Sequence, residues 1–127
     1  MEKEFVPYEL AVKLKELGFD EECFGVYIAG QLMITNDSIY NSTDIPVIKV
    51  PTFSQAFRWF REKHKLQHHI WSGKLNHIFY GYDILNIEEQ EFVMNNSDIG
   101  GGDCDYDTYE EAEQACLDKL IEIVEAK

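Results

Sequence analysis

The stretch PTFSQAFRWFREKHK, residues 51–65, is the segment that most plainly predicts a single helix. Thr52 precedes an apolar run and Gln55 stands three positions later, which is the pattern of an N-terminal capping box. Three phenyl rings and one methyl group recur at helical spacing and predict a buried side: Phe53, Ala56, Phe57 and Phe60. Three cations fall on another side: Arg58, Arg61 and Lys65. We therefore expect one side of this helix to anchor a core and another to present positive charge.

Length and composition predict a single domain over residues 1–127. A chain of this length buries roughly two thirds of the surface that its unfolded form exposes. Eight Phe, seven Tyr and two Trp argue against disorder, because aromatic side chains supply large buried areas. There is no secretory signal pattern and no stretch approaching the roughly 18 apolar residues of a membrane span. Three cysteines without close spacing complete a pattern typical of a cytoplasmic protein with no membrane partner.

The formal net charge of −13 is unevenly distributed along the chain. Residues 58–77 contain five Lys or Arg and one acidic residue, whereas residues 83–118 contain twelve acidic residues and no Lys or Arg. Charge blocks of this kind mark either interaction surfaces or solvated faces. The sequence therefore predicts a surface with separate positive and negative regions.

Turn signals and apolar periodicity predict the other elements. A first helix at 7–17 ends in a Schellman-type stop at Gly18 and Phe19. Extended segments follow in two groups, a hairpin of 23–28 and 32–34 with an edge stretch at 45–50, and a meander of 67–72, 76–84 and 90–95. Thr108 and Glu111 form a second capping box before a last apolar helix. The order α-β-β-(β)-α-β-β-β-α predicts an α+β fold, with two or three helices packed on antiparallel sheets.

Three blocks of the chain resemble a family of small uncharacterised proteins that bacteriophages and prophages encode. The blocks are VPYELAVKLKELGFD (6–20), PTFSQAFRWFREKH (51–64) and YDTYEEAEQACLDKLIEIV (106–124). The resemblance extends over most of the chain and implies a phage-derived context and a shared fold. Because that family has no assigned activity, the resemblance implies no functional residues.

The first candidate site is the basic, aromatic window at residues 58–77. Phosphate groups bind clustered cations, and exposed rings beside the cations stack on bases. The candidate binding residues for a nucleic acid or another anionic ligand are Arg58, Arg61, Lys65 and Trp59. The negative charge of the remaining chain opposes a long polyanion. The competing interpretation is that the arginines pair with the chain's own acidic loops or only solvate the helix.

Histidines and aspartates supply two incomplete candidates for a metal site. His64 and His68 share a face if the helix continues, and His69 faces His77 if a hairpin joins them, but zinc needs three or four converging ligands. The acidic loop at 98–107 begins like an EF-hand calcium loop and then lacks the glycine and the glutamate that such a loop requires. The sequence therefore predicts no metal and no cofactor.

No local pattern marks a catalytic nucleophile. Cys116 falls on the apolar side of the last helix and is interpreted as a small core residue. Cys104 lies among carboxylates, which disfavour a thiolate. We therefore expect a protein that is not an enzyme.

These patterns lead to the hypothesis of a small, acidic, phage-type module that binds another protein without catalysis. The protein partner is unspecified, and a homodimer that joins the basic region to the acidic loop is one form of it. Two hypotheses of another class remain. In the first, the 58–77 window binds nucleic acid; in the second, the acidic stretch 83–113 imitates a polyanion and occupies a DNA-binding protein.

Overall fold

The computed structural model describes residues 2–28, 31–34, 47–74, 76–95 and 106–127. It divides the chain into two compact units, Met1–Ala56 and Phe57–Lys127, which we call the N-unit and the C-unit. The single domain expected over residues 1–127 stays a prediction. The acidic loop at 98–107 falls almost entirely outside the described residues, and so does Cys104.

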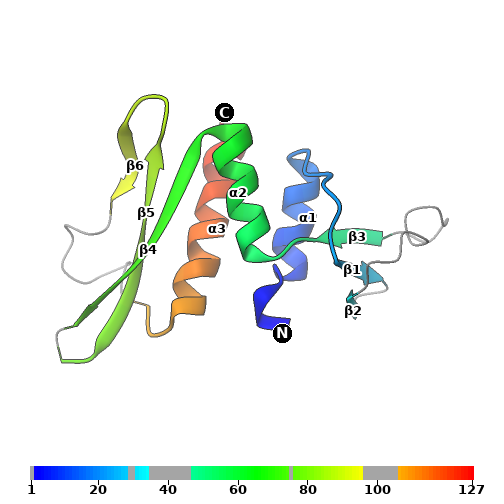
Figure 1. Cartoon of the computed structure of the whole chain (residues 1–127), viewed down its shortest axis with the longest axis horizontal. Coiled ribbons are helices and arrows are strands. Elements are labelled where there is room, and N and C mark those ends of the chain that lie inside the picture. The colour runs from blue at the N-terminus through cyan, green and yellow to red at the C-terminus, as the bar shows by residue number, and fades with distance from the viewer. Residues whose placement is uncertain (1, 29–30, 35–46, 75, 96–105) are drawn as a thin grey trace. The chain divides into compact units, whose positions relative to one another are not determined.

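Over the described residues the chain forms three α-helices and six strands, after a short 3-10 helix at Glu2–Glu4. The helices are α1 (Tyr8–Glu16), α2 (Phe53–His64) and α3 (Tyr109–Glu125). The strands are β1 (Gly25–Ile28), β2 (Gln31–Ile34), β3 (Val47–Val50), β4 (Leu66–Lys74), β5 (Ile78–Asn86) and β6 (Glu91–Asn95). They build two antiparallel sheets with the strand orders β2-β1-β3 and β4-β5-β6 (Figure 1). The predicted α+β fold and its element order are confirmed.

The sheet of the N-unit has β1 at its centre. Tyr27 of β1 lies opposite Leu32 of β2 and Ile48 of β3. The predicted hairpin of β1 and β2 is therefore confirmed, and β3 is the edge strand that the sequence predicts. Val26 and Val50 are buried, whereas Phe24, just before β1, is 66% exposed.

The C-terminal end of α1 has the predicted Schellman geometry. The amide of Phe19 donates to the carbonyl of Leu14 at 3.0 Å, and the amide of Gly18 donates to that of Lys15 at 3.0 Å. Gly18 has a φ of 101°, which glycine adopts without steric cost. Phe19 folds back and is buried, so the chain turns sharply after α1.

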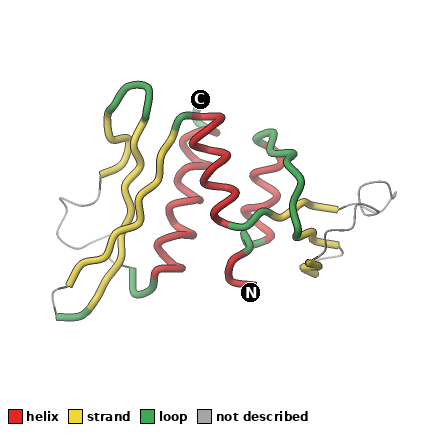
Figure 2. Tube along the Cα trace, in the orientation of Figure 1, coloured by secondary structure: helices red, strands yellow, loops and turns green. Residues whose placement is uncertain are grey.

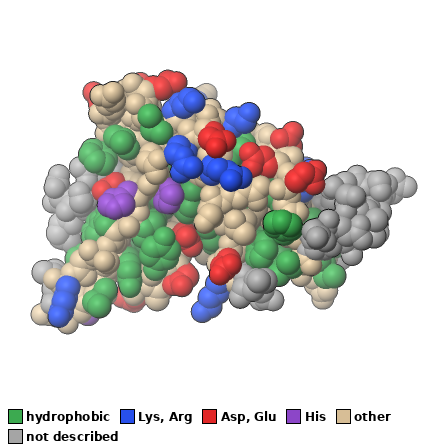
Figure 3. Space-filling model, viewed as in Figure 1, with side chains coloured by type: hydrophobic (Ala, Val, Ile, Leu, Met, Phe, Trp, Pro, Cys, Tyr) green, Lys and Arg blue, Asp and Glu red, His purple; other side chains and the backbone are tan. Residues whose placement is uncertain are grey.

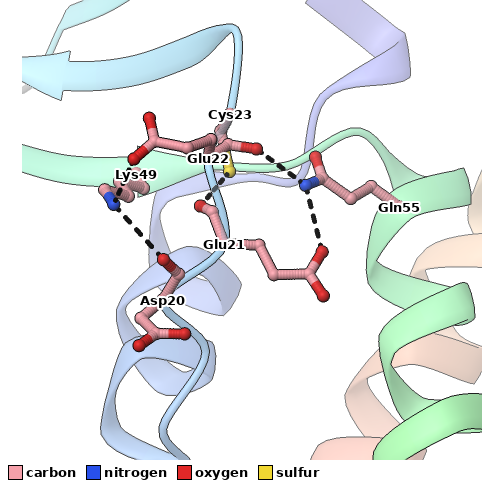
Figure 4. Close-up of polar contacts among 6 residues, drawn as sticks. All are labelled: Asp20, Glu21, Glu22, Cys23, Lys49 and Gln55. Atoms are coloured by element: carbon pink, nitrogen blue, oxygen red, sulfur yellow. Dashed lines mark hydrogen bonds and ion pairs between the residues drawn. The ribbon is translucent and has the colours of Figure 1, made fainter. Parts of the chain in front are cut away.

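Polar contacts hold the link between α1 and β1 against the start of α2 and against β3 (Figure 4). Gln55 Nε2 donates to the carbonyl of Glu22 at 2.9 Å and to Glu21 Oε1 at 3.3 Å. Lys49 Nζ donates to the carbonyl of Asp20 at 3.3 Å and lies 3.5 Å from Glu22 Oε1. Most of these partners are partly or fully exposed, so they position the segment more than they stabilise it.

Helix α2 follows the pattern read from its sequence. The amide of Gln55 donates to Thr52 Oγ1 at 3.2 Å, which confirms the N-terminal cap. The apolar residues expected on its inner side are all buried: Phe53, Ala56, Phe57 and Phe60. Lys65 has a φ of 57° and ends the helix in the left-handed conformation. Its carbonyl accepts from the amide of Ile87 at 2.9 Å, which ties the end of the helix to the end of β5.

The sheet of the C-unit is the predicted meander, with β5 at its centre. Against β5, His69 of β4 lies opposite Asp83 and Trp71 lies opposite Gly81. On the other side of β5, pairing with β6 is interrupted by a register shift between Ile84 and Leu85. Such a shift twists the edge of a sheet.

Helix α3 packs along this sheet and completes the core of the C-unit (Figure 2). Its inward residues are buried: Ala112, Cys116, Leu117, Leu120 and Ile121. The interpretation of Cys116 as a small core residue is thus confirmed. The amide of Glu111 donates to Thr108 Oγ1 at 3.1 Å, which confirms the second predicted cap.

We predict that Thr108→Ala lowers the free energy of unfolding by about 1 kcal/mol, because an amide in the first turn of α3 loses its acceptor. Chemical denaturation monitored by circular dichroism measures the change. Thr108→Ser retains the hydroxyl and is expected to keep most of the stability. An equal loss in both variants would show that the hydroxyl is not the stabilising group.

Candidate functional site

The two faces of the β4-β5-β6 sheet have different neighbours, because both helical segments of the C-unit contact the same face. The ring of Tyr109 on α3 lies edge-on to that of Tyr80, with centroids 6.2 Å apart. The ring of Phe57 on α2 stacks on His68, with centroids 3.8 Å apart and an interplanar angle of 8°. Ile84, which lies opposite His68, is fully buried. We call this side the inner face and the other the outer face.

The outer face carries the side chains that alternate with those of the inner face. Its described members include Gln67, His69, Trp71, Phe79, Asp83, Leu85 and Phe92. Trp71, Phe79 and Leu85 are half-buried, and Phe92 is 55% exposed. Within the described part of the C-unit, the outer face thus offers a row of aromatic and aliphatic side chains.

Glycines in the strands leave room for two aromatic rings of the outer face to lie close to the backbone. The indole of Trp71 covers Gly81, where even a Cβ atom would overlap its six-membered ring. The ring of Phe79 covers Gly73 in the same way. The two rings meet edge-on with centroids 5.9 Å apart, an arrangement that aromatic pairs favour.

Asp83 fixes the indole of Trp71 from the neighbouring position on β5. Trp71 Nε1 donates to Asp83 Oδ1 at 3.3 Å, and His69 Nδ1 lies 3.8 Å from Asp83 Oδ2. Asp83 is only 5% exposed, whereas the side chain of His69 is 68% exposed. The cluster is suited to holding a rigid aromatic surface in one orientation.

The predicted binding residues on α2 divide into exposed cations and a buried ring. Arg58 and Lys65 are exposed and Arg61 is half-buried, so the expected cationic side of α2 is present. Figure 3 shows Lys and Arg side chains close to a histidine side chain. Trp59 is only 4% exposed and contacts Phe60 edge-on, so the prediction that its ring is available for stacking is wrong. Its position one turn from Ala56 and next to Phe60 places it on the apolar side of the helix. Ligand binding by the three cations stays a prediction.

The structure separates the histidine pairs considered as metal ligands. Helix α2 ends at His64, and His68 lies on β4, so the two do not share a helix face. His69 lies opposite Asp83, and His77 precedes β5, so these two do not face each other across the hairpin. No group of three or more metal-ligating side chains occurs among the described residues.

The described thiols have environments that disfavour nucleophilic chemistry. Burial, above all, raises the pKa of Cys23 to about 12. Burial also raises the pKa of Cys116 strongly, and the carboxylates of Glu113 and Asp83 add to the shift. A thiol is reactive as its thiolate, which both sites oppose.

Sequence reasoning did not identify the outer face, although part of its signal was present. In the sequence, Trp71 and the histidines fall in the basic window at 58–77, Phe79 and Phe92 fall in predicted strands, and Leu85 lies just outside the predicted strand 76–84. The distinguishing signal was the pairing of bulky residues with glycine at Gly73 and Gly81. That pairing depends on strand register, which the local sequence does not specify.

We predict that Gly81→Ala displaces the indole of Trp71 and lowers the free energy of unfolding by roughly 1–3 kcal/mol, because the added methyl group overpacks the site. The indole N–H resonance of Trp71 should shift as its bond to Asp83 is lost. Ser72→Ala, at an exposed position of β4, is the matched control and should leave the resonance in place. An unmoved resonance in Gly81→Ala would contradict the close packing of the indole against Gly81.

We predict that stability decreases as the pH falls from about 6.5 towards 4, in part because of His68. Burial, then the charges of Arg61 and His69, lower the pKa of His68 from 6.5 to about 4. Its Nδ1 atom is buried without a hydrogen-bond partner among the described residues. In this pH window His68 is protonated in the unfolded chain and neutral in the folded chain. Protonation therefore stabilises the unfolded state and lowers the free energy of unfolding.

The difference in unfolding free energy between the unaltered chain and His68→Leu, followed over this pH window, isolates the histidine. NMR titration of His68 should further show a higher pKa in Arg61→Gln and an unchanged one in Lys63→Gln. A pKa of His68 that Arg61→Gln leaves unchanged would place the guanidinium away from the imidazole.

Within the described residues, no helix is both long and apolar enough to cross a membrane. Comparison of the chain with protein-family models, curated proteins and solved structures gave no match.

Proposed function

We propose that this chain is a small, non-enzymatic, phage-type protein of the cytoplasm that binds another protein through the outer face of the β4-β5-β6 sheet. The observation that carries the proposal is that, among the residues the structure describes, the helices of the C-unit contact one face of this sheet and leave the aromatic side chains of the other face partly exposed. Helices of the C-unit contact the inner face, while half-exposed Trp71 and Phe79 and exposed Phe92 lie on the other. Exposed clusters of large apolar side chains are typical of protein-binding surfaces.

Preorganisation of the aromatic rings supports this assignment. Trp71 is held by Asp83 and by the flat backbone at Gly81, so binding would not have to order it. Large aromatic side chains that are already ordered lose little conformational entropy on binding, and they dominate the energetics of many interfaces. A surface of this kind favours a protein partner of matching shape.

The charge of the sheet favours a protein over a nucleic acid as the occupant of the outer face. Residues 66–95 contain one Lys and four acidic residues, a net charge of −3. Binding of nucleic acid depends mainly on the neutralisation of phosphates by cations. Nucleic-acid binding through Arg58, Arg61 and Lys65 is the second candidate function, and the exposure of Arg58 and Lys65 supports it.

The test is affinity capture from a lysate of the native host, with the unaltered chain compared with Phe92→Ser. We expect Phe92→Ser to reduce capture of the specific protein at least about tenfold. Burial of a Phe side chain stabilises an interface by about 1.5–3 kcal/mol, and 1.4 kcal/mol corresponds to a factor of ten. Quantitative mass spectrometry of the captured proteins provides the measurement.

Phe24→Ser is the matched control, since Phe24 is also exposed but belongs to the N-unit. Capture that both variants reduce equally, or that neither reduces, rules out the outer face as the binding surface. The chain could instead capture nucleic acid. Loss of that nucleic acid in high salt, and in the double variant Arg58→Gln with Lys65→Gln, would support nucleic-acid binding. Sedimentation of the purified chain shows whether the partner is a second copy.

A further inference from the structure

The turn between β5 and β6, with the residues that flank it, forms a structured tip of the sheet at residues 86–93. Asn86 Oδ1 accepts from the amide of Glu89 at 3.1 Å, and Gln90 adopts the left-handed conformation with a φ of 56°. The amide of Ile87 donates to the carbonyl of Lys65, which anchors the first residue of the turn to the end of α2. The side chains on this tip are therefore presented from a defined backbone.

The tip combines exposed apolar side chains with exposed carboxylates. Three of its large apolar residues are exposed: Ile87, Phe92 and Val93. Three acidic residues lie next to them in the sequence or one position further away, and these are also exposed: Glu88, Glu89 and Glu91. The tip contains no Lys or Arg. The exposed apolar side chains give a partner area to bury, and the three carboxylates add charge of one sign to the same short segment.

We infer that the partner docks on this tip through a segment that is both basic and apolar, with Lys or Arg alternating with aliphatic or aromatic side chains. The inference rests on the proposed function and specifies the partner's chemistry. Apolar side chains of the segment cover Phe92, Val93 and Ile87, while its cations approach the three carboxylates. Exposed ion pairs contribute little affinity each, so the apolar contacts supply most of the binding and the charges select the partner.

The chain's own basic stretch does not supply this segment. The cations of α2 are exposed, but the apolar side chains between them, Phe57, Trp59 and Phe60, are buried in the C-unit. A second copy that docked through α2 would thus bring positive charge without apolar side chains to cover Phe92. Charge and exposure together favour a different protein with a basic amphipathic segment over self-association.

The experiment uses the full chain and three fluorescent peptides of equal length, in which Arg alternates with Leu, Arg with Ser, or Glu with Leu. Fluorescence anisotropy measures the dissociation constants. We expect the Arg–Leu peptide to bind at least about tenfold more tightly than the other two, and NMR shifts to concentrate at Phe92 and Val93. Absence of Arg–Leu binding overturns the inference, and so does equal binding of Arg–Ser, which would leave charge alone as the cause.

Charge reversal at the tip provides the second arm. We expect Glu88→Lys, Glu89→Lys and Glu91→Lys together to weaken Arg–Leu binding at least about tenfold. The matched control makes the same change in net charge at exposed helix positions: Glu62→Lys, Glu122→Lys and Glu125→Lys. If the control variant loses as much affinity for the Arg–Leu peptide, net charge alone explains the loss and the inference is overturned. If the tip variant does not fold, replacement of the same three residues by Gln takes its place.

The outcomes also separate this inference from the proposed function. Preferred binding of the Glu–Leu peptide, lost in Phe92→Ser, would refute a basic partner but leave protein binding at the outer face intact. A host protein could also be captured by the unaltered chain and by the charge-reversed tip variant but not by Phe92→Ser. This result would likewise refute a basic partner and leave protein binding at the outer face intact. If Phe92→Ser changes neither the capture of any protein nor the binding of any peptide, both the inference and the proposed function are refuted.

Discussion

The helices of the C-unit cover the β4-β5-β6 sheet on one face, and the organisation of that unit depends on this constraint. A strand places successive side chains on opposite faces, so burial of Ile84 and stacking of His68 on Phe57 determine where their neighbours Asp83 and His69 lie. Burial against the helices stabilises the inner face through the hydrophobic effect. Among the described residues, the outer face is ordered by contacts within the sheet itself.

The outer face obtains that order from a combination of small, aromatic and charged residues. Glycine at position 81 lets the indole of Trp71 lie on the backbone, and Asp83 accepts its N–H. A buried carboxylate is costly unless it is hydrogen-bonded, which makes the contacts of Asp83 with Trp71 and His69 structurally significant. The result is an aromatic surface whose indole is held by contacts within the sheet, while the 86–93 tip adds exposed apolar and acidic side chains.

Much of the fold could be predicted because it depends on local signals. The caps at Thr52 and Thr108, the Schellman stop at Gly18 and the apolar spacing of α2 each involve residues within one or two helical turns. The candidate site was predicted less well. Trp59 was assigned to the cationic side through its sequence neighbours Arg58 and Arg61, although the helical period places it with Phe60 in the core. Charge clustering in a sequence window does not distinguish the faces of a helix.

The sequence by itself determined the elements, their order and the burial of the three phenyl rings of α2, because helix periodicity, caps and turn residues act over short distances along the chain. Only the tertiary structure decided that Trp71 lies on Gly81, that Asp83 accepts its N–H, and that Phe92 joins the same face through β6. Those contacts depend on strand register and on which face the helices cover. Register is a non-local property, since a shift of one residue would exchange the faces while leaving every local pattern unchanged.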